Sequence, residues 1–390
     1  MQKYSQIAAL LQQCLDRKST LKSIILKSSS NQSFVRQAYA IISKAIQHYE
    51  QLYQIVEEIK SIQYIDIFDY NLLIVLMLDI FNPQNKKAKK MGGVVARYLK
   101  THKVLIKQLL EQNKIYEQEK KYIYIRALQQ LPFESENDEH IPNLCKVDYD
   151  IYSQYLSKNP EFLKGNTYIV QSKSSALPAY LLLRNIKNKI ADIIDCCAAP
   201  GNKTIQLSHY AKQNNITGKI YAIERDEKRF EILKNRLNKY NCENVQPLNF
   251  DFLTIKPRDY PNIKIALLDP SCSGSGMLQL RMIEASKDDS IEVPDDKKEQ
   301  VTQLSQFQSK MLHHLTFFKQ LKLIIYSTCS IYKEENEDVA NNFLQLHQQW
   351  ESVNLFPEWP YRGIDNNQHF IRVPPKESDG FFVAMFKRKQ

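Results

Sequence analysis

The sequence predicts an α/β fold: a doubly wound, mostly parallel sheet that follows an all-α N-terminal domain and a small α+β module. Two observations support this fold class. Apolar residues recur every three or four positions through residues 4–112, a stretch with almost no Gly or Pro. Strand-like and helix-like segments then alternate from residue 189 onward. The expected domains are residues 1–115, 116–188 and 189–390.

The N-terminal region is expected to be helical, as in the apolar series Ile7, Leu10 and Leu11. Helix breaks are predicted at residues 82–85 (NPQN) and at the Gly pair 92–93. The most apolar stretch, residues 70–81, is far shorter than the roughly 20 residues that span a bilayer, so a buried core helix is predicted there. The basic cluster at residues 86–90 (KKAKK) is either a solvated loop or an RNA-phosphate contact.

The middle of the chain has a different pattern. Residues 121–126 (KYIYIR) alternate as a strand, an acidic turn-rich loop follows at 134–140, and a second strand is expected at 167–171. The aromatic and basic side chains of this linker module either stack on single-stranded bases, as in an RNA-recognition module, or form a simple core.

The C-terminal region contains seven predicted strands in about 200 residues, a number that fits one open α/β sheet. They are residues 191–196, 219–223, 245–250, 263–268, 321–326, 370–373 and 381–386. The charged stretch 287–298 has no apolar periodicity and is expected to be a mobile loop or insertion.

A nucleoside-bearing cofactor is expected where these strands end. Residues 195–204 (DCCAAPGNKT) place small side chains and a Pro-Gly turn before a helix, without the G-x-G-x-x-G of a dinucleotide site. Glu224, at the end of the next strand, can accept hydrogen bonds from ribose hydroxyls, and Asp251 can accept one from an adenine amino group. These features point to S-adenosylmethionine. The expected binding residues are Cys197, Ala198, Ala199, Pro200, Gly201, Asn202, Lys203, Glu224, Arg229, Asp251 and Asp269.

Two of these assignments have alternatives. Arg229 is either the basic group nearest the ribose or a plain surface residue. Lys203 contacts the cofactor or the target ribose and phosphate, or it caps and packs near the helix start.

Two cysteines, Cys272 and Cys329, each lie just beyond a predicted strand. A thiolate is nucleophilic enough to attack an electron-poor ring such as a pyrimidine. The alternative is two inert core thiols, which their strand-end positions beside small, polar neighbours disfavour. The seven cysteines include no C-x-x-C pair, so neither a metal site nor a disulfide framework is expected, and reduced thiols indicate an intracellular compartment. Structural roles are expected for Cys14, Cys145, Cys196 and Cys242, and a backbone role for Cys197.

The formal charge of +10 suits a polyanionic partner without identifying one. Five motifs identify a family more closely: residues 195–204, 269–276 (DPSCSGSG), 326–330 (YSTCS), 334–337 (EENE) and 380–384 (GFFVA). Together they resemble the NSUN (Nop/Sun-domain) RNA cytosine-carbon-5 methyltransferases over about residues 120–387. The resemblance implies a Rossmann-like, class I S-adenosylmethionine-dependent domain.

The order DPSCSGSG, with Ser271 between the proline and Cys272, is similar to the branch numbered five, which modifies large-subunit rRNA. Residues 171–179 and 18–22 also resemble that branch. The family's attacking thiol implies Cys329 as nucleophile, with Cys272 assisting product release; the pattern of the DNA enzymes would select Cys272 instead. Asp269 is expected to hydrogen bond ring nitrogen 3, for which it has to carry a proton at neutral pH.

The resemblance implies an rRNA cytosine-C5 methyltransferase that is monomeric and nucleolar and acts on flipped or single-stranded RNA, with no membrane or DNA partner. The rivals are the same reaction on tRNA or another RNA, a DNA enzyme, and a ribosome-assembly factor that needs no catalysis. Three residues depart from the family pattern: Ser172 stands in place of Asp, Arg126 in place of Asn, and Asn202 in place of Gly. The first two put details of RNA contact in question.

Overall fold

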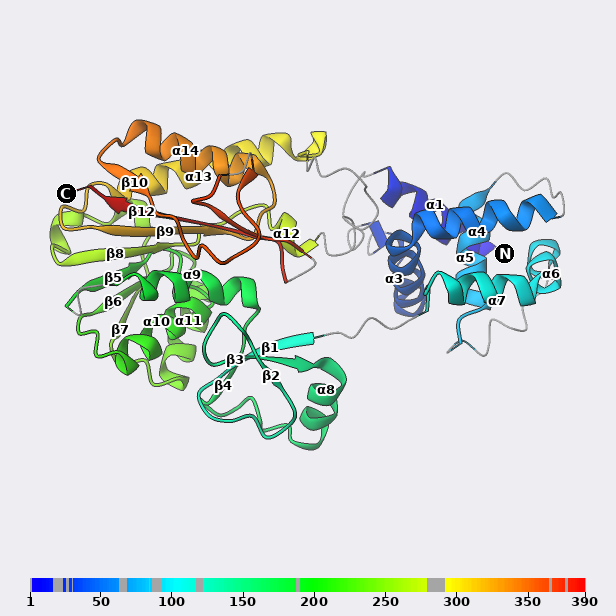
Figure 1. The fold of residues 1–390 in the computed structure, drawn as a ribbon, viewed down its shortest axis with the longest axis horizontal. Helices are drawn as coiled ribbons and strands as arrows, with labels where there is room; N and C mark the ends of the chain where they lie inside the picture. Colours follow the sequence, from blue (N-terminus) through cyan, green and yellow to red (C-terminus); the bar gives the residue numbers. More distant parts are fainter. Residues whose placement is uncertain are drawn as a thin grey trace. The chain divides into compact units, whose positions relative to one another are not determined.

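The computed structural model describes residues 2–16, 24–25, 28–29, 31–62, 69–83, 85, 93–116, 122–186, 190–278, 292–364, 367–375 and 378–389 (Figure 1). These residues fall into two compact units, one that ends at Tyr116 and one that begins at Tyr122. Two expectations, the basic cluster at 86–90 and the family-like segment 18–22, lie outside the described residues.

The first unit is helical, as predicted. Its helices are α1 (Gln2–Leu15), α3 (Gln32–Gln47), α4 (Tyr49–Ile62), α5 (Tyr70–Ile80), α6 (Val94–Thr101) and α7 (Lys103–Gln112). Helix α5 is the buried core helix that the apolar stretch predicts, and α1, α3 and α4 pack against it. Asp69 caps its first turn by accepting a hydrogen bond from the backbone N–H of Leu72 at 2.9 Å. Among the described residues, no helix has the length and apolar character needed to cross a membrane.

The second unit opens with a small antiparallel sheet of order β2-β3-β1-β4. Its elements are β1 (Tyr122–Ala127), β2 (Glu136–Asn137), β3 (Leu144–Asp148), α8 (Tyr149–Lys158) and β4 (Tyr168–Val170). Strands β1 and β4 match the two predicted strands. Strand β3, one of the two inner strands, was not predicted from the sequence, and β2 lies in the predicted acidic loop. Both strands are too short or too polar for a clear alternation of apolar residues.

The main sheet of the second unit contains all seven predicted strands and one more. They are β5 (Asp192–Asp195), β6 (Ile220–Ile223), β7 (Val245–Leu248), β8 (Ile263–Leu268), β9 (Leu323–Thr328), β10 (Trp350–Ser352), β11 (Ile371–Val373) and β12 (Phe381–Arg388). The prediction of seven strands was therefore one too few: β10 pairs antiparallel with β12. It has three residues, of which only Trp350 is buried, so no periodic pattern reveals it.

The order β10-β12-β9-β8-β5-β6-β7, with β11 on β12, makes this a doubly wound sheet. Strands β7, β6, β5, β8 and β9 are parallel, and β12 runs antiparallel to β9. The chain order reverses between β5 and β8, which makes this the topological switch point where open α/β sheets bind ligands.

Helices cover both faces of the main sheet, as Figure 1 shows. Helices α9 (Lys173–Arg184), α10 (Asn202–Gln213) and α11 (Glu227–Lys239) lie on one face, and α13 (Lys298–Leu315) and α14 (Glu337–Leu346) on the other. Successive strand residues point to opposite faces, so Ile193 packs under α9 while Ile194 faces α13. Both faces are apolar because both are buried.

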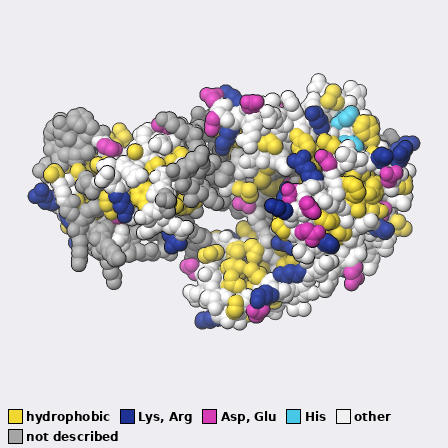
Figure 2. Space-filling model, turned by 180° about the vertical axis from the view of Figure 1, so that it is seen from behind, with side chains coloured by type: hydrophobic (Ala, Val, Ile, Leu, Met, Phe, Trp, Pro, Cys, Tyr) yellow, Lys and Arg dark blue, Asp and Glu magenta, His cyan; other side chains and the backbone are white. Residues whose placement is uncertain are grey.

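The charged stretch 287–298 was expected to be a mobile loop or insertion. In its described part, Asp295–Lys297 forms a 3-10 helix and α13 begins at Lys298. Residues 279–291 lie outside the described part. Basic and acidic side chains are mixed over the face of the second unit that Figure 2 shows, so the positive net charge does not gather into one patch there.

Candidate active site

Four of the residues with candidate chemistry lie at the carboxyl ends of adjacent parallel strands. Asp195 is the last residue of β5, and Glu224, Asp269 and Cys329 directly follow β6, β8 and β9. Because parallel strands end at the same edge of a sheet, this topology brings together residues that are more than a hundred positions apart in the chain.

Lys203 and Asp269 form an ion pair at this edge. Lys203 Nζ lies 2.7 Å from Asp269 Oδ2, and the Ser327 hydroxyl donates to Asp269 Oδ1 at 2.6 Å. Lys203 Nζ also donates to Ser175 Oγ at 3.3 Å. Lys203 and Ser327 thus hold the two oxygens of the Asp269 carboxyl group.

The two thiols predicted to do chemistry are in contact, with Cys272 Sγ 3.1 Å from Cys329 Sγ. The hydrogen bond from Cys272 lowers the pKa of Cys329, and the charge of Lys203 acts in the same direction against the effect of burial. Donating that bond raises the pKa of Cys272 well above its ordinary value, and burial adds to the rise. The thiolate therefore forms preferentially on Cys329.

The loop that carries Cys272 is held by a buried glutamate. Glu335, with no exposed surface, accepts hydrogen bonds through Oε1 from the Ser273 backbone N–H at 3.0 Å and from Gln308 Nε2 at 2.9 Å. Gln308 also donates to the Ser271 carbonyl at 3.1 Å and accepts from the Tyr326 hydroxyl. Glu335 and Gln308 thus fix the backbone on both sides of Cys272.

Two glycines join the loops that carry the two thiols. The Gly276 N–H donates to the Cys329 carbonyl at 2.9 Å, and the Gly380 N–H donates to the Gly276 carbonyl at 3.2 Å. A Cβ at Gly276 would lie 2.0 Å from the Gly380 carbonyl oxygen, closer than any real side-chain contact. Only glycine permits this approach of the backbones.

Asp195 is the main buried acid on the cofactor side. It is 1% exposed, and its Oδ2 accepts from the Thr204 hydroxyl at 2.7 Å. Its Oδ1 has no hydrogen-bond partner among the described residues. Burial raises the pKa of Asp195 to about 7, against the opposing effect of the Thr204 hydroxyl. An unpaired buried acceptor at a ligand-binding edge indicates a site for a group that donates hydrogen bonds.

The loop after β5 has the small side chains that the sequence suggests for cofactor binding. Ala198 and Ala199 are buried, Pro200 follows them, and Gly201 adopts a left-handed φ of 105° before α10 begins at Asn202. Burial raises the pKa of the neighbouring Cys197 thiol, which favours its neutral form. The side chain of Asn202 accepts from Arg236 on α11 and is thereby oriented toward that helix.

The residues expected at the ribose and adenine are positioned by local contacts. Glu224 is 5% exposed, and its Oε1 accepts from the Asp226 N–H at 2.9 Å. Arg229 Nη1 lies 3.7 Å from Glu224 Oε2, and its Nη2 donates to the Ala199 carbonyl at 2.7 Å. Arg229 therefore links the acid to the small-residue loop. Asp251 caps a short 3-10 helix, Phe252–Thr254, by accepting from the Leu253 N–H.

These hydrogen-bond acceptors and the small-residue loop fit a nucleoside cofactor. Glu224 and Asp195 offer carboxylate oxygens for hydroxyl or amino groups, and the Ala198 to Gly201 loop lets a ligand approach the backbone closely. The residues lie on both sides of the switch point between β5 and β8, next to the two thiols.

A model of the family described as 16S rRNA methyltransferase RsmB/F matches residues 181–387, which include every residue of this site except Ser175. The chain belongs to the RsmB/F methyltransferase family. This membership confirms the family identified from the sequence motifs.

Two relatives of this RsmB/F family member come from a mammal and a yeast. A 28S rRNA (cytosine-C(5))-methyltransferase of Mus musculus is 35% identical over 243 residues, which cover 60% of this chain and 50% of the relative. A 25S rRNA (cytosine-C(5))-methyltransferase of Schizosaccharomyces pombe is 33% identical over 261 residues, which cover 63% of this chain and 54% of the relative. The chain thus spans about half the length of these relatives.

A solved structure with the same fold is that of a methyltransferase homologue from Pyrococcus horikoshii. The two align with a TM-score of 0.54 at 21% identity, over 76% of this chain and 96% of the other. This likeness confirms the Rossmann-like fold class of the RsmB/F family member.

The structure brings together most of the predicted site residues and adds four that were not predicted from the sequence. These are Asp195, Ser175, Ser327 and Gln308. Gln308 had a detectable signal, because it occupies an apolar position of α13 seven residues after Val301, where a buried polar side chain needs a partner. Glu335 lay within a motif of the family resemblance, but no role was assigned to it.

Two family departures now have structural explanations in this RsmB/F chain. Ser172 caps α9, and its hydroxyl accepts from the Ser175 N–H. Arg126 is 4% exposed and donates from Nε to Gln171 Oε1 at 3.0 Å, so it is an internal residue of the sheet. Cys14, Cys145, Cys196 and Cys242 are all buried, as expected for structural cysteines.

Proposed function

We propose that this protein is an S-adenosylmethionine-dependent RNA cytosine-C5 methyltransferase that forms 5-methylcytosine in large-subunit rRNA. The observation that carries the proposal is the 3.1 Å contact between Cys272 and Cys329 beside the Lys203–Asp269 pair. Two thiols of opposite pKa shift suit a reaction that needs one thiolate to attack and one thiol to exchange a proton. The names of the mouse and yeast relatives support large-subunit rRNA as the substrate.

In this proposal the Cys329 thiolate adds to carbon 6 of the target cytosine, forming a carbon–sulfur bond. The ring takes up a proton at nitrogen 3, and carbon 5 becomes nucleophilic. Lys203 is positioned to donate that proton, and Asp269 to orient Lys203 through their 2.7 Å contact. After carbon 5 has gained a methyl group, it loses its proton to solvent water, the carbon–sulfur bond breaks with Cys329 leaving as a thiolate, and nitrogen 3 returns its proton to Lys203. Cys272 assists this release.

Bound S-adenosylmethionine would supply the methyl group. The proposed binding residues are Asp195, Glu224 and Asp251, with the backbone of the loop from Cys197 to Lys203. Arg229 holds Glu224 and the loop together. Asp195, whose unpaired Oδ1 suits a hydrogen-bond donor, is added to the set expected from the sequence.

The proposed partner is RNA in a large ribosomal subunit or its precursor, in the nucleolus. The target cytosine has to be single-stranded or flipped, because a stacked base cannot present carbon 6 to a thiol. The protein is proposed to act as a monomer, with no DNA or membrane partner. The small α+β sheet and the helical unit are the proposed RNA-holding parts.

Bisulfite sequencing of total RNA from cells with and without the protein tests this function. The expected result is the loss of methylcytosine from large-subunit rRNA, with recovery by the wild type and no recovery by Cys329→Ala. Loss from tRNA would show a different substrate. Normal ribosome assembly together with unchanged methylcytosine in all RNA would contradict the catalytic proposal.

A further inference from the structure

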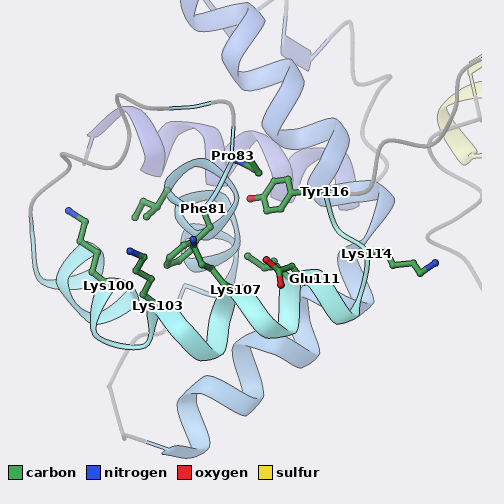
Figure 3. Close-up of a pocket in the computed structure, with 10 residues that line it drawn as sticks. Phe81, Pro83, Lys100, Lys103, Lys107, Glu111, Lys114 and Tyr116 are labelled. Carbon is green, nitrogen blue, oxygen red and sulfur yellow. The ribbon is translucent and has the colours of Figure 1, made fainter. Parts of the chain in front are cut away.

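A cavity of about 720 Å³ lies wholly within the helical unit, far in sequence from the thiols. It is lined by the C-terminal end of α5, by α6 and α7, and by the residues that follow α7 (Figure 3). This volume is in the range of small-molecule sites and is large enough for one nucleotide. Nothing in the proposed reaction uses it.

The cavity has an apolar floor. Ile80, Phe81 and Leu110 line it and are at most 8% exposed. Tyr116 forms part of the wall, and its hydroxyl donates to the Leu78 carbonyl at 2.7 Å, which fixes the ring. Burial raises the pKa of Tyr116, so the phenol stays neutral. A rigid phenol ring and a phenylalanine offer surfaces on which a planar base can stack.

The rim of the cavity is basic. Lys103 and Lys107 are one turn apart on α7, and both are exposed. Figure 3 shows both rising from α7 toward Phe81, whereas Lys114 extends away from the cavity. The described residues that line the cavity include four lysines and one acid, Glu111. This excess of positive charge beside apolar rings complements a ligand with an anionic group and a flat ring.

We propose that this cavity binds one nucleotide of single-stranded RNA, at a distance along the strand from the cytosine that is methylated. Lys103 and Lys107 contact its phosphate, and the base stacks against Phe81 and Tyr116. Glu111 accepts a hydrogen bond from the base's exocyclic amino group. Its carboxylate would repel a second phosphate at this position. The inference rests on the proposed function in one respect, namely that the substrate is RNA.

The first test is the salt dependence of RNA binding by the full chain, measured by fluorescence anisotropy with a labelled single-stranded oligocytidine. Each phosphate neutralised on a single strand contributes about 0.7 to the slope of log K against log salt. Because both lysines contact one phosphate, the double variant Lys103→Gln/Lys107→Gln should lower that slope by about 0.7, which is about a fivefold loss of affinity at 0.1 M salt relative to 1 M. The matched control is Lys228→Gln/Lys234→Gln on α11, which removes the same charge and should leave the slope unchanged.

The second test concerns the base. Glu111→Gln should reduce the preference for oligocytidine over oligouridine, because uracil has no exocyclic amino group. Photocrosslinking with a 5-iodocytidine-substituted oligocytidine, which keeps the exocyclic amino group, should label peptides that contain Phe81 or Tyr116. Equal slopes for the lysine variant and its control, or crosslinks that avoid both peptides, would overturn the inference. The inference would also be overturned if Lys103→Gln/Lys107→Gln weakened the binding of heparin, an anion without bases, as much as the binding of RNA.

These outcomes are separable from failure of the proposed function. If the wild type methylates RNA and the Lys103→Gln/Lys107→Gln variant binds RNA with an unchanged salt slope, the cavity proposal alone is refuted. If the wild type binds no RNA, both the cavity proposal and the proposed function are refuted. Circular dichroism checks that the helical unit of the lysine variant is folded, and calorimetry with S-adenosylhomocysteine checks the separate unit that carries the cofactor residues.

Discussion

Glu335 accepts the backbone N–H of Ser273 at 3.0 Å, through the same oxygen that accepts from Gln308. Glu335→Gln replaces the carboxylate that accepts both hydrogen bonds with an amide. It should lower the free energy of unfolding by about 1–3 kcal/mol. We also expect slower product release, because the loop that carries Cys272 loses its anchor. A denaturing gel should then show more covalent RNA–protein complex than for the wild type.

The adjacent residue provides the control for this experiment. Glu334 is exposed and precedes Glu335 in the same short helix. Glu334→Gln should match the wild type in stability and in covalent complex. If Glu335→Gln lowers stability without any increase in the complex, Glu335 has only a structural role.

The two thiols should behave differently when each is removed. Cys329→Ala should lose methyl transfer by on the order of 10⁴-fold or more and form no covalent complex with RNA. Cys272→Ala should still attack the base but release it slowly, so the complex should accumulate. Cys145→Ala, in the small sheet, should behave as the wild type. The reverse pattern would assign the nucleophile to Cys272, as in a DNA enzyme.

The buried Asp195 should make stability depend on pH. Its pKa of about 7 in the folded protein is above the unfolded value of 3.8, so the folded state binds more protons between these two pH values. The free energy of unfolding should therefore fall as pH rises from about 4 to about 7, by at most about 1.4 kcal/mol per pH unit, and level off above. Urea unfolding of the cofactor-free protein measures it. Asp195→Asn should remove this part of the dependence; parallel curves for the two proteins would contradict the assignment.

Arg126 should affect stability and not RNA binding. Its Nε donates to Gln171, whose amide donates to Gln206 at 3.0 Å, and Gln206 donates to the Ala176 carbonyl. Arg126→Lys cannot keep this planar contact and should lower the free energy of unfolding by about 1 kcal/mol. The salt slope of RNA binding should stay the same. A lower slope would mean that Arg126 reaches the RNA, which its 4% exposure argues against.

The parts of the fold that could be predicted are those with periodic patterns. The seven predicted strands of the main sheet have apolar runs or alternation, and α5 has a long apolar stretch. The three-residue β10 and the two-residue β2 do not, because pairing with neighbours distant in sequence stabilises them more than their own residues do. The same limit hid β3, whose partner β1 supplies its register.

The site residues divide in a similar way. Asp269, Cys272 and Cys329 lie next to strands in distinctive motifs, so their position could be predicted from the sequence. Their mutual contacts could not, because the 2.7 Å Lys203–Asp269 pair joins positions 66 residues apart. Ser175 lies on a helix with no local sign of chemistry, and only packing brings it to the site.

The close approach of Gly276 and Gly380 has a consequence for redesign of this protein. Since main-chain hydrogen bonds connect Gly276 to Cys329 and Gly380 to Gly276, the spacing of the two sulfur atoms depends on the backbone more than on neighbouring side chains. Side chains that face the target base could then be exchanged for others to change which nucleobase is accepted, while the reactive pair keeps its spacing. An alanine at either glycine would separate the two loops and leave such redesign without a reactive centre.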